Sequence, residues 1–127
     1  MSKNISNNID VIVNTSYIES QSIPEDKQYV FSYTITLHNT GSQAAQLESR
    51  HWIITDANGQ IQEVRGEGVI GEKPLLQSGE EYRYTSGAVI KTPVGSMRGS
   101  YQMVAQDGTK FDAMIPVFTL STPNILH

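Results

Sequence analysis

The segment at residues 64–71, VRGEGVIG, contains the spacing G-x-G-x-x-G, which cradles a pyrophosphate group in dinucleotide-binding proteins. Glycine-rich turns bind anions because their backbone N–H groups can converge on phosphate oxygens, and Arg or Lys side chains nearby add charge-assisted hydrogen bonds. A pyrophosphate or nucleotide ligand is therefore one hypothesis for this chain. Its candidate anion-binding residues are Arg65, Gly66, Gly68, Gly71 and Lys73.

The surroundings of this motif favour a structural interpretation instead. In a dinucleotide-binding fold the glycines precede a helix whose N-terminus faces the pyrophosphate. Here the following residues, EKPLLQSG at 72–79, are too short and too broken for such a helix, and Glu67 and Glu72 add negative charge. We therefore favour glycines that supply positive φ angles for a tight crossover, and keep anion binding as the alternative.

Arg50 and Trp52 raise a second hypothesis, recognition of a protein partner, because both residue types are enriched at binding hot spots. Trp52 has the same parity as Ile54 along its strand, which favours a place in the core. Arg50 and Arg65 are then the candidate partner-binding residues. Recognition would use the loops around residues 65–73, and the loops at 66–79 and 88–96 could lie together at one end of the sandwich. An exposed sheet edge offers another route, by strand addition from a protein partner that the sequence does not identify.

Residues suited to catalysis or metal binding occur without the spacing that these chemistries need. His38 and His51 do not form an H-x-x-x-H pair, and no loop gathers carboxylates. Ser86 could combine with His51 and Asp56, but the G-x-S-x-G elbow of a serine nucleophile is missing. The sequence therefore predicts no catalytic residue, no metal site and no cofactor, and a protein that is not an enzyme.

The composition indicates one globular domain over residues 1–127, with an ordered core at about residues 9–120. Hydrophobic residues make up 38% of the chain and charged residues 17%, which argues against disorder. The net charge of −4 disfavours a nucleic-acid partner, and no apolar stretch suits a signal peptide or a membrane span. Because the chain has no cysteine, it forms no disulfide, and we expect a cytoplasmic location.

Alternation of apolar and polar residues predicts strands along most of the chain. It is clearest at residues 29–37, where aromatic and aliphatic residues occupy the odd positions. Further strands are predicted at residues 9–17, 45–56, 60–65, 81–85, 97–104 and 110–120, with hairpin turns at residues 56–59 and 107–108. The inward residues of the last two strands are predicted to be Met97, Tyr101, Met103, Phe111, Ala113, Ile115 and Val117.

Two irregular segments interrupt this pattern. In the strand at residues 45–56 the parity changes between Leu47 and Trp52, which predicts a β-bulge near residues 49–51. Residues 66–79 show no periodicity, and loops of this length in compact domains are usually functional. About seven strands with this turn spacing predict an all-β fold, a two-sheet β-sandwich of the fibronectin-III or immunoglobulin-like type without a disulfide.

Several longer motifs occur in one order along the chain: SRHWIITD at residues 49–56, VRGEGVIG at 64–71, YTSG at 84–87, TPVGSMRGSYQMV at 92–104 and DGTKFDAMIPVFTL at 107–120. Together they resemble the bacterial ApaG protein family over about residues 9–120. Ala88 stands where members of that family often carry a cysteine, which argues against a thiol-dependent role here.

The resemblance implies a fibronectin-III-like sandwich in a small cytoplasmic protein, associated with cobalt and magnesium tolerance. Similar domains in F-box proteins and in a polymerase-interacting protein are thought to mediate protein contacts. We therefore expect a small cytoplasmic binding or adaptor domain that acts through protein–protein contacts. The sequence leaves its oligomeric state open.

Overall fold

The structure, a computed structural model, describes residues 7–123 as two antiparallel β-sheets packed face to face. The strands are β1 (Ile9–Tyr17), β2 (Tyr29–Asn39), β3 (Ala45–Asp56), β4 (Ile61–Glu67), β5 (Leu75–Leu76), β6 (Glu81–Ile90), β7 (Val94–Ala105) and β8 (Lys110–Ser121). Two single 3₁₀ turns, η1 (Glu19–Gln21) and η2 (Pro24–Asp26), join β1 to β2. The predicted all-β two-sheet sandwich is confirmed, and the short strand β5 is added to the seven that the sequence predicts.

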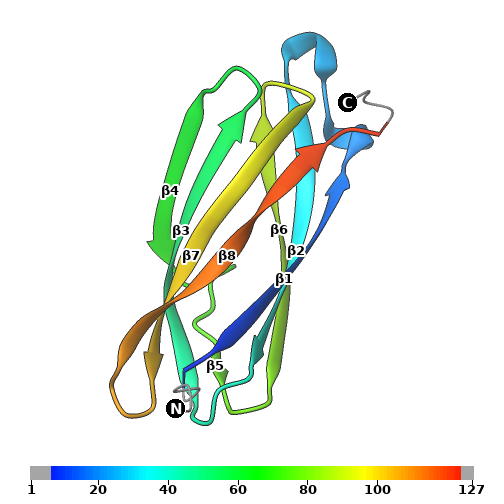
Figure 1. Cartoon of the computed structure of the whole chain (residues 1–127). Coiled ribbons are helices and arrows are strands. Elements are labelled where there is room, and N and C mark those ends of the chain that lie inside the picture. Colours follow the sequence, from blue (N-terminus) through cyan, green and yellow to red (C-terminus); the bar gives the residue numbers. More distant parts are fainter. Residues whose placement is uncertain (1–6, 124–127) are drawn as a thin grey trace.

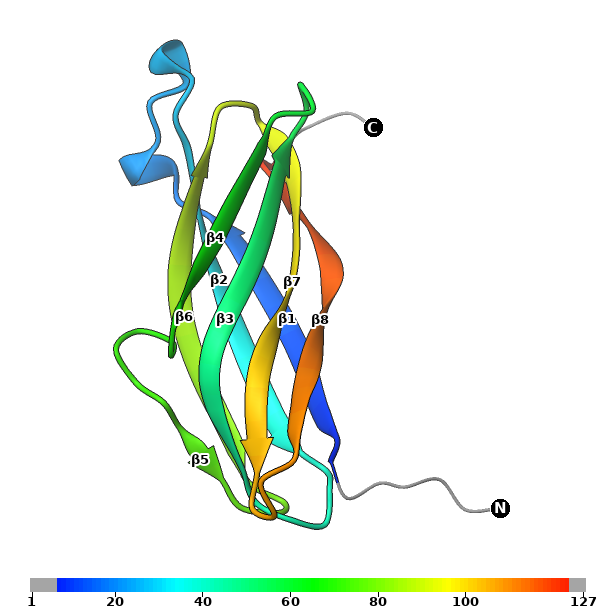
Figure 2. The ribbon, with the colours of Figure 1, turned by 90° about the vertical axis from the view of Figure 1, so that its left-hand side faces the viewer.

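One sheet has three strands in the order β1-β2-β6 (Figure 1). The other has the order β4-β3-β7-β8, and β5 pairs with the first two residues of β3. Along one side of the sandwich β1 contacts β8, which joins the two sheets. Along the opposite side β4 and β6 are the edge strands, and Figure 2 shows this side facing the viewer. Strand β4 pairs only with β3 among the described residues.

The core lies between the sheets because strand alternation directs one set of side chains inward. In β2 the odd residues Phe31, Tyr33, Ile35 and Leu37 are buried, as the alternation predicts. Trp52 is only 2% exposed, so its predicted place in the core is confirmed. No helix in the described part of the chain is long and apolar enough to cross a bilayer.

The predicted bulge in β3 is confirmed, but it lies slightly earlier in the chain. Leu47 pairs with Met103 and Ser49 with Gln102, so Glu48 is the residue without a partner on β7. The extra residue lets Leu47 and Trp52 face the same core in spite of their opposite parity.

The prediction that Val117 faces the core is wrong, since its side chain is 67% exposed. The register of β7 and β8 shifts between Met97 and Gly99, and Met97 pairs with Phe118 while Gly99 pairs with Ile115. This irregularity reverses the parity of β8 after Ile115. Phe118 and Leu120 therefore fill the inward positions of its second half.

The segment at residues 66–79 is more ordered than its lack of periodicity predicts. Strand β4 continues to Glu67, Val69 and Glu72 form a bridge, and β5 pairs with Ala45 and Gln46. Both predicted hairpins form, each with a glycine of positive φ after the turn, Gly59 and Gly108. The strands run from Ile9 to Ser121, and residues 1–6 and 124–127 lie outside the described part.

Candidate functional site

Gly66 lies in β4 directly opposite Arg50 of β3, and the guanidinium group of Arg50 packs across it. A Cβ atom at position 66 would lie 2.8 Å from Nη2 of Arg50. From this position Nη1 of Arg50 donates hydrogen bonds to the carbonyl oxygens of Glu67, at 3.0 Å, and Gly68, at 2.8 Å. The first glycine of the motif therefore makes room for an arginine that fixes the following turn.

Gly68 and Gly71 both have positive φ angles in the same turn, but only Gly68 is also in close contact with the neighbouring backbone. Gly68 has a φ of 64°, and a Cβ atom there would lie 2.3 Å from the carbonyl oxygen of Glu72. Val69 and Glu72 exchange two backbone hydrogen bonds around Ile70 and Gly71, whose φ angles are 44° and 79°. Positive φ at both central positions is typical of a type I′ turn. No helix follows, so the motif here is a strand end and a tight hairpin.

The charged residues around this turn are paired with carboxylates. Nζ of Lys73 lies 2.9 Å from Glu67 and 3.6 Å from Glu48. Nη2 of Arg65 lies 3.1 Å from Glu63. The carboxylate of Glu67 raises the pKa of Lys73, and Lys73 in turn lowers the pKa of Glu67.

Backbone N–H groups of the turn also have partners inside the protein. Gly68 donates to the carbonyl oxygen of Glu48, and Val69 and Glu72 donate to each other. The five candidate anion-binding residues are thus brought together along one segment. An incoming anion would have to compete with Glu48 and Glu67 for Lys73 and with Glu63 for Arg65.

The two candidate partner-binding residues differ in exposure. The side chain of Arg65 is 71% exposed on the outer face of the larger sheet. Arg50 was predicted to be an exposed contact, but it is half-buried, because the bulge at Glu48 gives it the inward parity of Trp52 and Ile54. Arg50 therefore stabilises the turn, and Arg65 is the more exposed of the two candidates.

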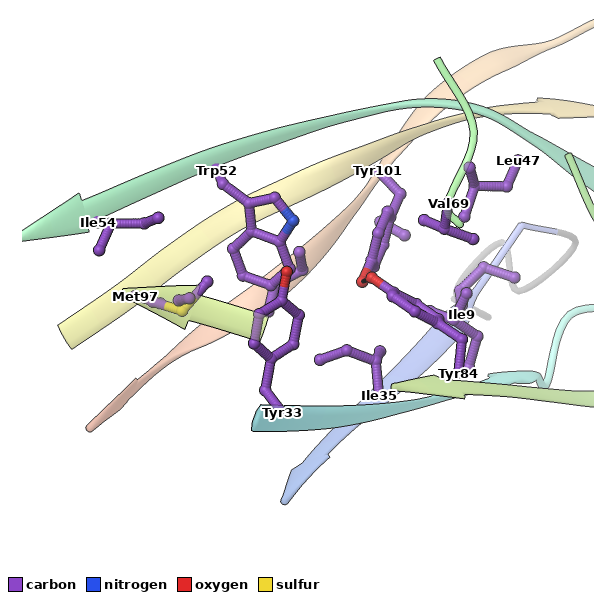
Figure 3. Close-up of a cluster of buried hydrophobic side chains, with 14 of the residues drawn as sticks. Ile9, Tyr33, Ile35, Leu47, Trp52, Ile54, Val69, Tyr84, Met97 and Tyr101 are labelled. Carbon is purple, nitrogen blue, oxygen red and sulfur yellow. Dashed lines mark hydrogen bonds between the residues drawn. The ribbon is translucent and has the colours of Figure 1, made fainter. Parts of the chain in front are cut away.

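Between the sheets, near Arg50, three tyrosines place their hydroxyl groups in the core. The hydroxyl groups of Tyr84 and Tyr101 form a hydrogen bond across the sandwich, and Tyr33 packs against Trp52 with ring centroids 5.2 Å apart (Figure 3). Burial raises the pKa of all three tyrosines, whereas the positive charge of Arg50 acts in the opposite direction. These hydroxyls therefore remain protonated inside the core, and in the pair of Tyr84 and Tyr101 one hydroxyl donates to the other.

The residues considered for catalysis are not gathered in one place. Nε2 of His51 contacts Oε2 of Glu63 at 2.5 Å on the outer face of the larger sheet. The carboxylate of Asp56 accepts hydrogen bonds from the backbone N–H groups of Asn58 and Gln60 in the hairpin. Ser86 belongs to β6 in the other sheet. Among residues 7–123 no group of three or more His, Asp or Glu side chains is placed to hold a metal ion.

A trough on the outer face of the larger sheet is the feature that the sequence did not predict. Outward residues of β7, Gln102 and Val104, alternate with the buried residues Tyr101 and Met103. They line a hollow of about 780 Å³ together with residues of β3 and β8. We call this hollow, with the two that adjoin it, the outer trough. Its middle is lined by Glu48, Gln102, Met103, Val104, Lys110, Phe111 and Asp112.

The outer trough extends in both directions along β3 and β7. At one end a hollow that shares Gln102 and Asp112 reaches His51 and Arg65. At the other end a hollow that shares Glu48 and Val104 reaches Leu75 and Gln77. The surface thus crosses the sheet from the candidate contact Arg65 to the short strand β5. The bulge at Glu48, which the parity change does predict, lies in its middle.

Ile70 and Leu75 are exposed apolar side chains of the segment after β4, and Leu75 lines one end of the outer trough. Ile70 is 58% exposed and Leu75 is 56% exposed, whereas Val69 and Leu76 of the same segment are each 1% exposed. Ile70 also has a positive φ, which is unusual for a β-branched residue and costs about 1–3 kcal/mol. Residues in such strained positions cluster at functional sites. The signal in the sequence is Ile-Gly at the place where a type I′ turn favours Asn-Gly.

Comparison with known proteins identifies relatives of similar length. A family model described as the ApaG domain matches residues 19–105. Protein ApaG of Thiobacillus denitrificans is 60% identical over 119 residues, which are 94% of each chain. Protein ApaG of Azoarcus sp. is 58% identical over 127 residues, which are 100% of each chain.

Solved structures agree with this relationship. The crystal structure of the putative ApaA protein from Bordetella pertussis has a TM-score of 0.91 at 48% identity and covers 94% of this chain and 97% of its own. The PapD-like domain of human CEP192 has a TM-score of 0.51 at 10% identity, covers 96% of this chain and 90% of its own, and shares the fold alone. The family model and the full-length relatives show that this chain belongs to the ApaG domain family.

Proposed function

We propose that this protein is a small binding domain that contacts a protein partner through the outer trough and the adjoining residues 65–73, without bond-making chemistry. The observation that carries the proposal is a row of three adjoining hollows that share lining residues across the outer face of the larger sheet. Sites of protein recognition combine shape with a few apolar anchors and a polar surround. The outer trough offers this combination along two strands.

The polar groups of the outer trough can hydrogen-bond to a peptide. Ser49 donates to Gln102, and Gln102 donates to Ser100, so the side chains across β3 and β7 are held in one network. The flanking charges have both signs, with Lys110 and Asp112 along β8. An extended segment of a partner with mixed charges and one or two apolar side chains would fit this surface.

The alternative ligand, pyrophosphate or a nucleotide at residues 66–71, is retained as a second proposal because Arg65 and Lys73 flank the turn. It would require these side chains to leave Glu63 and Glu67. An amide NMR titration with pyrophosphate, and then with ATP, distinguishes the two proposals. Saturable shifts confined to residues 65–73 would support the anion site, and an unchanged spectrum would leave the partner proposal alone.

Site-specific photo-crosslinking in cells tests the partner proposal. A benzoylphenylalanine at Gln102 lies in the outer trough, and the matched control at Thr34 lies on β2, on the outer face of the smaller sheet. We expect a discrete protein adduct from position 102 that is absent from position 34. Equal labelling from both positions, or no adduct from position 102, would contradict the proposal.

The cytoplasmic location is part of the same proposal, and cell fractionation checks it. Any role in cobalt or magnesium tolerance would be indirect, through the partner. Fractionation that placed the protein outside the cytoplasm would require a different class of partner.

A further inference from the structure

Within residues 7–123, strand β4 is an edge of the larger sheet: it pairs with β3 on one side and with no strand on the other. Six of its seven residues are exposed, and Gly66 is the exception. Val64 and Gln62 have the inward parity of Trp52 and Ile54, their partners on β3, yet both are exposed. The smaller sheet therefore does not cover the inner face of β4.

The hydrogen bonds at the two ends of β4 show which backbone groups are free. Asp56 donates to the carbonyl oxygen of Gln60, and Gly68 donates to the carbonyl oxygen of Glu48. Backbone groups of an antiparallel strand alternate between its two neighbours, so the even residues of β4 face β3. The odd residues, among them Glu63 and Arg65, direct their N–H and C=O groups to the free edge.

We propose that this edge binds a second copy of the same chain, by antiparallel pairing of β4 with β4 about a two-fold axis at Val64. In this register Glu63 of one copy lies directly opposite Arg65 of the other, on the outer face, and the reciprocal pair repeats the contact. Val64 meets Val64 on the inner face. Directly opposite side chains in antiparallel strands interact, and unlike charges stabilise the pair.

The charge pattern selects this register over its neighbours. Pairing centred on Glu63 would place two glutamates together, and pairing centred on Arg65 would place two arginines together and Glu63 against Glu67. Both arrangements are destabilised by like charges. Natural sheet edges are often protected by charges of one sign, but Glu-Val-Arg is complementary to its own antiparallel copy.

The contact is small, so the dimer is expected to be weak and to form only at high protein concentration. The carbonyl oxygen of Glu67 already accepts a hydrogen bond from Arg50, which limits the new ladder to the residues around Val64. Pairing would join the larger sheets of two copies edge to edge. The inference rests on the backbone edge of β4, whereas the proposed partner contacts the outer trough. Arg65 belongs to both surfaces, and the dimer is therefore measured on the purified protein without a partner.

Charge reversal tests the register. Glu63→Arg or Arg65→Glu places like charges opposite each other, and we expect either variant to raise the dimer dissociation constant at least about tenfold. The double variant Glu63→Arg with Arg65→Glu restores unlike pairs and should restore dimerisation. Arg98→Glu makes the same change in net charge as Arg65→Glu, at an exposed position of β7, and should leave the dissociation constant unchanged.

Sedimentation velocity over a wide concentration range gives these constants, and thermal unfolding shows that each variant is folded. Hydrogen exchange gives a second measurement. On concentration, the amides of Glu63 and Arg65 should become protected, whereas those of Gln62 and Val64 should not change. A protein that stays monomeric throughout, or a dimer indifferent to both reversals, would overturn the proposal.

Discussion

The guanidinium group of Arg50 occupies the space above Gly66 that the Cβ atom of any other residue would need. This relationship explains why a glycine stands in a strand, where glycine is otherwise unfavourable. Arg50 reaches the carbonyl oxygens of Glu67 and Gly68 only across that space. Together with Gly68 and Gly71, the pair accounts for all three glycines of the fingerprint by the requirements of folding.

Replacement of Gly68 by alanine should strongly destabilise the protein. The new Cβ atom would lie 2.3 Å from a backbone oxygen at a φ of 64°, and we expect a loss of about 3 kcal/mol or more in the free energy of unfolding. Gly71→Ala is the control, since its φ is also positive but no atom lies within 4 Å. It should cost about 1 kcal/mol. Denaturant unfolding gives both values, and equal losses would mean that the close contact at Gly68 is unimportant.

The hydroxyl groups of Tyr84 and Tyr101 should be coupled. Tyr84→Phe leaves the hydroxyl of Tyr101 buried without its partner, and we expect a loss of about 1–3 kcal/mol in stability. Tyr101→Phe should behave similarly. The double variant should lose clearly less than the sum, because it leaves no unpaired hydroxyl. Strict additivity in this double-mutant cycle would show that the two hydroxyls do not interact.

The same tyrosines should make stability fall at alkaline pH. Burial raises the pKa of Tyr84 and Tyr101 above the ordinary value of about 10. Their contribution is therefore complete below pH 10 and is lost as the pH rises from 10 through their folded pKa values. Unfolding free energies measured across this range should decline, and the decline should be smaller in the double Phe variant. A flat profile would contradict the burial argument.

The strained turn at Ile70 predicts a stabilising substitution. Ile70→Asn creates the Asn-Gly pair that a type I′ turn favours, and it should raise the unfolding free energy by about 1 kcal/mol. Ile12→Asn is the matched control, because Ile12 is 54% exposed in the regular strand β1, and there asparagine should be destabilising. If Ile70→Asn lowered stability, the isoleucine side chain would have a packing role that outweighs its strain.

The pairing of Glu63 with His51 should appear in a titration. The hydrogen bond from His51 lowers the pKa of Glu63 below the usual value for glutamate, and Arg65 adds to the shift. The pairing therefore contributes stability above the unfolded pKa of about 4.3, and this contribution is lost as the pH falls through the folded pKa. In His51→Gln the carboxyl titration, followed by NMR, should move back towards the usual value. An unchanged titration of Glu63 in this variant would mean that Arg65, and not His51, lowers the pKa of Glu63.

Local regularity decided how well each part of the fold could be predicted. Strand β2 alternates without interruption, and its buried set follows from parity. Alternation misplaces Val117 because Val117 and Phe118 are adjacent apolar residues, and the register shift between β7 and β8 decides which of them faces the core. Strand β5 was missed because two residues are too few to show a period.

The sequence by itself determined the all-β class, the parity change that produces the bulge in β3, and the absence of a helix behind the glycine motif. Each of these depends on neighbours along the chain. Only the tertiary structure decided that Arg50 lies over Gly66, that the outer trough joins Arg65 to β5, and that β4 is left as a free edge. These features depend on which strands become neighbours and in what register. The local periodicity of the sequence does not determine this long-range pairing.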